Sequence, residues 1–173
     1  MPHPEQYITA RDAAMLASAV IRNYPEYYRW YSQKEFTWNG ITQQNRNGLL
    51  WRDPSVDGVK TGHTKSAGYC LVVSAKRGDM RLLSAVMGTD SMRAREDANA
   101  ALLNYGYNFF ETKRIFAAGQ PLTSVRVWKG AEPEVALTLK RDLYVTGQRG
   151  RMGSVQAEFE LPEHLIAPLS AET

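Results

Sequence analysis

The chain has 173 residues, of which 43% are hydrophobic and 23% charged, with a formal net charge of +3. This length suits one domain, or one domain and part of another. The composition is that of an ordinary globular protein, and the absence of any run of Lys and Arg argues against nucleic-acid binding. No stretch approaches the roughly 18 apolar residues of a transmembrane helix, so no membrane anchor is expected.

Cysteine and histidine are too few and too scattered for a disulfide or a zinc site. Cys70 is the single cysteine, and the three histidines, His3, His63 and His164, are widely spaced. We therefore expect neither a metal nor a cofactor. The first ten residues also lack the basic and apolar regions of a signal peptide, so the chain as written is expected to stay in the cytoplasm.

The N-terminal region predicts a helix followed by a hairpin. Over residues 9–23, Thr9 is a good N-cap, and Asp12 at the third helical position makes a near capping box. Further on, Asn39-Gly40 predicts a tight turn between two short strand-like runs. The apolar residues of the helix recur at the spacing of one buried face: Ala13, Leu16, Ala17, Val20 and Ile21.

The middle of the chain predicts a sheet and a second helix, which together make an α+β layer. Residues 58–62, 68–77 and 80–88 are strand-like, and the glycine turn at 78–79 joins the last two into an antiparallel hairpin. Residues 91–111 then show helical periodicity. The apolar positions of this helix are Ala94, Ala98, Ala101, Leu102, Tyr105 and Phe109.

The character of the sequence changes near residue 113. Residues 111–122 resemble a linker or domain entry, because Gly119 and Pro121 break regular structure. We therefore place one domain at residues 1–113 and a partial, all-β domain at 114–173. The strand-like runs of the second domain follow one another at short intervals: residues 124–130, 135–141, 143–147 and 154–161.

The clearest chemical motif is Lys60-Thr61-Gly62, on the first strand of the sheet. A glycine on a strand leaves room for a ligand backbone to lie alongside as an added strand. A neighbouring ammonium and hydroxyl can bind a carboxylate or orient a serine. Three residues alone are a weak signal, because the same pattern occurs by chance in about one chain in twenty-five of this length.

Longer stretches resemble a known family, the D-alanyl-D-alanine carboxypeptidases of the low-molecular-mass penicillin-binding protein group (penicillin-binding proteins 5 and 6). The resemblance covers nearly the whole chain and implies part of a β-lactamase/transpeptidase-like domain followed by the start of a small β domain. It rests on "RNGLLW" (46–51), "VDGVKTGHT" (56–64), "AGYCLVVSAKRGDMRLLSAVMG" (67–88), "LLNYGYNFFET" (102–112) and "RGRMG" (149–153).

The family works by acyl transfer, in which the serine of a Ser-x-x-Lys motif attacks the D-Ala–D-Ala bond and a Ser-x-Asn motif moves protons. Neither motif occurs in this chain. A triad of Ser66, His63 and Asp57 can be drawn from the composition, but three residues so close on one strand end rarely converge. The resemblance therefore implies no catalytic residue here, and we expect no activity from the chain alone.

The resemblance also implies which residues contact the substrate. Lys60 and Thr61 would receive the terminal carboxylate, Gly62 would let the peptide lie on the strand, and the His63 N–H would form half of an oxyanion hole. Arg46 and Arg95 match family arginines near the carboxylate. The implied ligands are peptidoglycan stem peptides or β-lactams, and the family acts in the periplasm.

Three functions fit these observations. The first is an inactive part of a D-Ala-D-Ala carboxypeptidase, and the second is a non-catalytic remnant that still binds peptidoglycan or a partner. The third is an interaction protein whose sheet is completed by a separate fragment that restores activity. The resemblance further implies an open edge at residues 80–88 and apolar side chains without partners, at Leu71, Val73, Leu83 and Val86.

Overall fold

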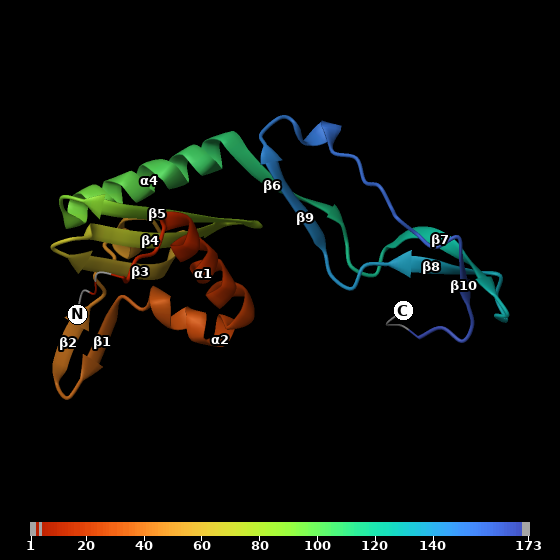
Figure 1. Cartoon of the computed structure of the whole chain (residues 1–173), viewed down its shortest axis with the longest axis horizontal. Helices are drawn as coiled ribbons and strands as arrows, with labels where there is room; N and C mark the ends of the chain where they lie inside the picture. The colour runs from red at the N-terminus through yellow and green to blue at the C-terminus, as the bar shows by residue number, and fades with distance from the viewer. Residues whose placement is uncertain (1–2, 4, 171–173) are drawn as a thin grey trace. The chain divides into compact units, whose positions relative to one another are not determined.

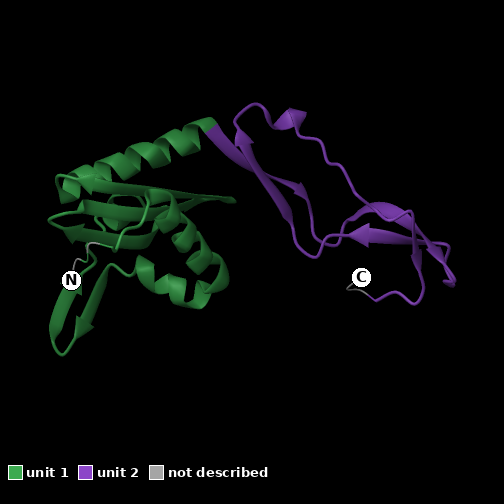
Figure 2. Cartoon of the chain, in the orientation of Figure 1, with its two compact units in different colours: residues 1–109 green, residues 110–173 purple. Residues whose placement is uncertain are grey.

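A computed structural model describes residue 3 and residues 5–170, and the chain divides into two compact units (Figures 1 and 2). The first comprises residues 1–109 and the second residues 110–173. The change of unit coincides with the end of a helix at Phe109 and the start of a strand at Phe110, whereas the sequence places it after Lys113. No helix among the described residues is long and apolar enough to cross a bilayer.

The predicted first helix is present as α1, Ala10–Asn23, and its capping box is confirmed. The Asp12 N–H donates to Thr9 Oγ1 at 3.1 Å, and the Thr9 N–H donates to Asp12 Oδ2 at 3.4 Å. The predicted buried face is only partly right. Ala17 is buried, but Leu16 is 61% exposed. Helix α1 contacts the sheet mainly through the edge strand β5 (Met80–Thr89) and to a smaller extent through β4.

Short elements carry the chain from α1 to the sheet. They are α2 (Pro25–Tyr28), the 3-10 helix η1 (Arg29–Ser32), the hairpin strands β1 (Glu35–Trp38) and β2 (Ile41–Gln44), and α3 (Leu49–Arg52). The predicted hairpin turn is confirmed. Asn39 and Gly40 have φ values of 49° and 73°, the two left-handed residues that a tight hairpin of this kind requires.

The central sheet contains the three predicted strands, in the order β3-β4-β5 and all antiparallel. Strand β3 spans Val56–Thr64 and β4 spans Gly68–Arg77, and β5 follows after the turn at 78–79. Strands β3 and β5 are therefore the two edges of the sheet. With the flanking helices this arrangement confirms the predicted α+β class.

The predicted second helix is α4, Met92–Phe109, but the apolar positions that indicated it do not form its buried face. Leu102 is 48% exposed, and Tyr105 and Phe109 are each 58% exposed. The residues that face the sheet are Arg95, Asn99, Leu103 and Tyr107. Two of these are polar, and they are buried because they bind backbone carbonyls of the sheet, a pairing that hydrophobic periodicity does not register.

The expectation that four apolar residues of the sheet lack partners is wrong for Leu71 and Val73, which lie on the face that α4 covers. Ser84 of β5 hydrogen-bonds Asn99 of α4, and the register pairs Ser84 with Val73, so this face of the sheet lies under α4. Leu71 is 1% exposed and Val73 is fully buried. The remaining two, Leu83 and Val86, are half-buried.

The second unit consists of short strands with a thin core. Strand β7 (Pro121–Trp128) lies between β8 (Glu134–Thr138), which is antiparallel to it, and β10 (His164–Ile166), which is parallel. Strand β6 (Phe110–Phe116) pairs with β9 (Leu143–Gln148), and the 3-10 helix η2 (Met152–Ser154) follows. Val125 and Met152 are the buried hydrophobic residues among those described here.

Two predictions for this unit were wrong. The expected linker begins as strand β6, since its residues pair with β9, about 30 positions away, a non-local contact that local sequence does not reveal. The run at 154–161 forms no strand, although its residues alternate. All of them are exposed, and no neighbouring edge pairs with them in the described chain.

Candidate functional site

The Lys60-Thr61-Gly62 motif lies on β3, an edge strand of the sheet. Lys60 is exposed, and its Nζ donates to the carbonyl oxygen of Thr61 at 2.5 Å. A side chain added at Gly62 would meet a single neighbouring atom, Cβ of Cys70, at 3.8 Å, so the space over this glycine is open. The motif is therefore presented on an accessible strand edge with room for a second backbone.

A cleft of about 540 Å³ brings three of the six predicted substrate residues together: Arg46, Lys60 and Thr61. Its remaining lining is aromatic, amide and, at one position, aliphatic: Tyr27, Trp30, Tyr31, Gln43, Asn45 and Val59. Two cations and a hydroxyl in one cleft favour an anionic ligand, and a carboxylate matches a guanidinium in particular.

The helical segment that carries the aromatic wall of the cleft is held against β3 by a partly buried polar cluster of Tyr28, Asp57 and Arg81. Tyr28 is 7% exposed, and its hydroxyl donates to Oδ1 of Asp57 on β3 at 2.7 Å. Burial is the main cause that raises the pKa of Tyr28 far above its ordinary value, so this phenol stays protonated and remains a donor. Arg81 pairs with the same carboxylate at 2.8 Å, which balances its charge.

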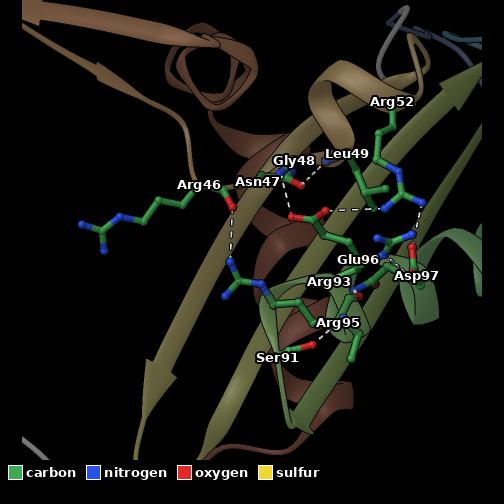
Figure 3. Close-up of polar contacts among 12 residues, drawn as sticks. Arg46, Asn47, Gly48, Leu49, Arg52, Ser91, Arg93, Arg95, Glu96 and Asp97 are labelled. Atoms are coloured by element: carbon green, nitrogen blue, oxygen red, sulfur yellow. Dashed lines mark hydrogen bonds and ion pairs between the residues drawn. The ribbon is translucent and has the colours of Figure 1, made fainter.

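The loop that carries Arg46 is fixed from two directions. The side chain of Asn47, 1% exposed, donates through Nδ2 to the Gly58 carbonyl of β3 at 3.1 Å. From the other direction, Oε1 of Glu96 on α4 accepts the Gly48 N–H at 3.1 Å (Figure 3). One contact fixes the buried side chain of Asn47 and the other fixes the backbone at Gly48, so the loop is held in place next to β3.

Ion pairs also connect α4 to α3, the helix that follows the Arg46 loop. Arg52 pairs with Asp97 at 2.7 Å and with Glu96 at 3.5 Å (Figure 3). The hydrogen bond from Arg52 lowers the pKa of Asp97, so the carboxylate stays charged in mild acid. The sequence did not single out Asn47, Glu96 or Asp97, because their partners lie far away in the chain and no short motif links them.

Arg95 occupies a different position from the other predicted substrate residues. It is 2% exposed, and its guanidinium donates to the carbonyl oxygens of Gly62 (3.3 Å), Cys70 (3.3 Å) and Arg46 (3.2 Å). The side chain of Arg46 points away from it (Figure 3). The structure thus places Arg46 in the cleft and Arg95 behind the strand and loop that form its wall.

His63 lies beyond the motif, beside a second hollow lined by residues 63–69 and 88–90. Its ring contacts that of Tyr69, with the centroids 4.0 Å apart. The triad drawn from the sequence does not assemble, because Asp57 is engaged with Tyr28 and Arg81, whereas Ser66 lies within hydrogen-bond distance of Thr64, at 3.2 Å between the hydroxyls.

Two family models match the chain. Residues 1–91 match the model described as D-alanyl-D-alanine carboxypeptidase, and residues 110–173 match that of the C-terminal domain of penicillin-binding protein 5. Among curated proteins, the D-alanyl-D-alanine carboxypeptidase DacA of Escherichia coli (strain K12) is 48% identical over 166 residues. The match covers 95% of this chain and 41% of DacA.

Solved structures agree with these matches. Penicillin binding protein 5 of Haemophilus influenzae is 43% identical with a TM-score of 0.82, covering 98% of this chain and 50% of that one. Penicillin-Binding Protein D2 of Listeria monocytogenes, solved in its ampicillin-bound form, is 29% identical with a TM-score of 0.57. That match covers 62% of this chain and 45% of the Listeria protein.

The chain spans half or less of the length of each of these relatives. The matched residues nevertheless include the whole of α1, the hairpin, the sheet with its Lys60-Thr61-Gly62 strand, and the second unit. These matches confirm the resemblance read from the sequence motifs: the chain belongs to the D-alanyl-D-alanine carboxypeptidase family of penicillin-binding proteins.

Proposed function

We propose that this chain forms the carboxylate-binding side of a serine-type D-Ala-D-Ala carboxypeptidase site, which takes peptidoglycan stem peptides. The observation that carries the proposal is the cleft that joins Arg46, Lys60 and Thr61 on an open strand edge. β-Lactams are proposed as ligands of the same wall, since ampicillin is bound in the structure of the Listeria relative.

The ligand's backbone is proposed to lie along β3 as an added strand. An edge strand offers unpaired N–H and C=O groups, and the open space at Gly62 lets a second backbone approach. The terminal carboxylate would then lie between Arg46 and Lys60, where the Lys60 ammonium would leave its present partner, the Thr61 carbonyl. Beyond the motif, the His63 N–H is proposed as one donor of an oxyanion hole.

The chain alone is proposed to bind without cleaving. Acyl transfer needs a nucleophile with its activating base, and neither Ser-x-x-Lys nor Ser-x-Asn occurs in the sequence. The serines nearest in pattern, Ser32 and Ser74, have a lysine two positions on rather than three. Two positions put the groups on different faces of a helix, and Ser74 lies on strand β4, fully buried, with its hydroxyl accepting from Arg81.

A fluorescent penicillin is therefore expected to leave no covalent label on the chain. After incubation and denaturing electrophoresis, the band of this chain should carry no fluorescence, while a family member that contains Ser-x-x-Lys should be labelled in the same gel. A labelled band from this chain that survives denaturation would show that a nucleophile is present and would overturn the proposal of an inactive chain.

Binding of the carboxylate is tested with two forms of one peptide. Acetylated Lys-D-Ala-D-Ala with a free C-terminus is expected to bind more tightly than its C-terminal amide, and Arg46→Met should reduce that preference about tenfold, the worth of one charge-assisted hydrogen bond. Titrations followed by backbone amide chemical shifts would measure both affinities.

The matched control is Arg11→Met, which removes an exposed guanidinium from α1, outside the cleft, and should leave the preference unchanged. If the wild-type chain binds the acid and the amide equally, or binds neither, the carboxylate-binding function is wrong.

A further inference from the structure

The first turn of α4 meets three other segments of the chain at a single side chain, Arg95. Its Nη1 donates to the carbonyl oxygens of Gly62 on β3 and Cys70 on β4, and its Nη2 donates to that of Arg46 in the loop before α3. Gly62 and Cys70 are paired in the sheet register. One guanidinium therefore ties the motif strand, its neighbour and the Arg46 loop together.

We propose that Arg95 is a positioning residue for the carboxylate site. It sets the place of Arg46 relative to Lys60 by holding the backbone behind them, and it does not touch the ligand. This inference rests on the proposed function for its ligand, but the geometry that supports it is independent of any ligand.

Burial and hydrogen bonding separate this role from direct binding. Arg95 is 2% exposed and is not among the residues that line the cleft. No ion pair of Arg95 occurs in the described part of the chain, so its charge is stabilised by backbone carbonyls and by the Tyr69 ring, whose centroid lies 5.7 Å from the guanidinium carbon. The planar guanidinium can reach several acceptors at once from one fixed position, which a lysine ammonium on its flexible stem cannot reproduce.

The surrounding contacts make the expected effect local. The Arg46 loop keeps two further anchors when Arg95 changes: Asn47 remains bound to Gly58, and Gly48 remains bound to Glu96. A substitution at Arg95 would therefore release the backbone at Arg46 while the loop stays attached. The side chain of Arg46 would lose its set direction into the cleft without the loop unfolding.

The test combines Arg95→Lys with a change at Arg46. Arg95→Lys is expected to lower the affinity for the acid peptide about tenfold, because the Arg46 carboxylate contact is lost. In an Arg46→Met background the same Arg95→Lys change should cause no further loss, since its effect acts through Arg46. Arg93→Lys is the matched control, because Arg93 lies on the same turn and is 89% exposed at its side chain.

The second variant, Arg95→Gln, retains a planar donor without the charge and covers the case in which the lysine variant fails to fold. Additive losses from Arg95→Lys and Arg46→Met would mean that Arg95 contacts the ligand itself. An unchanged affinity with a lowered thermal transition would mean a purely structural role. Either result overturns the proposal.

A readout without ligand distinguishes failure of this inference from failure of the proposed function. In Arg95→Lys, hydrogen exchange at the backbone amide of Asn47, which shares its peptide group with the Arg46 carbonyl, is expected to rise about tenfold. The Gly48 amide stays bound to Glu96 and should not change, and Arg93→Lys should change neither amide. If the wild-type chain binds the acid and amide peptides equally, but the Arg95→Lys variant shows the faster exchange, the proposed function is wrong and the role of Arg95 in holding the loop stands. Unchanged exchange at the Asn47 amide would refute the Arg95 role.

Discussion

Replacing Leu103 by alanine is expected to lower the free energy of unfolding of the first unit by about 2–5 kcal/mol. Leu103 is 2% exposed and lies on the face of α4 that covers the sheet. The loss combines the transfer of the removed methyl and methylene groups with the cavity that they leave. Leu71 and Val73 are buried on the face of the sheet that α4 covers, and close packing restricts how far they can relax into the space.

The preceding residue supplies a matched control. Leu102→Ala is the same chemical change on the same helix, but Leu102 is 48% exposed, so the expected loss is below about 1 kcal/mol. Urea unfolding followed by far-ultraviolet circular dichroism would report both variants, because all four α-helices of the described chain lie in the first unit. A larger loss at Leu102 than at Leu103 would mean that α4 packs in the register expected from its apolar residues.

Local signals were sufficient for most elements of the first unit. The Thr9–Asp12 capping box, the Asn39-Gly40 turn and the three strands of the sheet each depend on residues that are neighbours in the sequence. Hydrophobic periodicity was less informative about which face of a helix is buried. On α4 the buried face includes Arg95 and Asn99, which hydropathy counts as exposed.

The second unit was harder to predict because its pairings are non-local. Strand β6 forms by pairing with β9, and the short strand β10 pairs in parallel with β7, some 40 residues earlier in the chain. The run at 154–161 has the alternation of a strand but no partner in the described chain. A half-polar segment becomes a strand only when a neighbouring edge is available to it.

For the site, sequence motifs located the groups but not the framework that holds them. Lys60, Thr61 and Arg46 share a cleft, as their match to the family implied, whereas Arg95 lies behind its wall. Asn47 and Glu96 fix the Arg46 loop through contacts 11 and 48 positions away. Such contacts depend on the folded arrangement of strand, loop and helix, and no short pattern in the chain indicates them.

Asn99 provides the second large expected effect, because it is fully buried and links α4 to two strands. Its Oδ1 accepts the Ser84 hydroxyl at 2.6 Å, and its Nδ2 donates to the Leu71 carbonyl at 3.2 Å and to the Arg95 carbonyl at 2.7 Å. Asn99→Leu, which has a side chain of similar size, is expected to cost about 2–4 kcal/mol, because it leaves a buried donor and a buried acceptor without their partner.

The double variant Asn99→Leu/Ser84→Ala separates this cause from a packing defect. Removing the Ser84 hydroxyl as well leaves no buried donor to satisfy, so the double variant should recover about 1 kcal/mol relative to Asn99→Leu alone. Asn104→Leu, an identical change at an exposed position of α4, should be close to neutral in the same urea titration. A double variant that is less stable than Asn99→Leu would indicate that volume, and not the unpaired hydroxyl, sets the cost. In that case the polar contact between α4 and β5 would contribute little to holding the helix that carries Arg95 and Glu96 against the sheet.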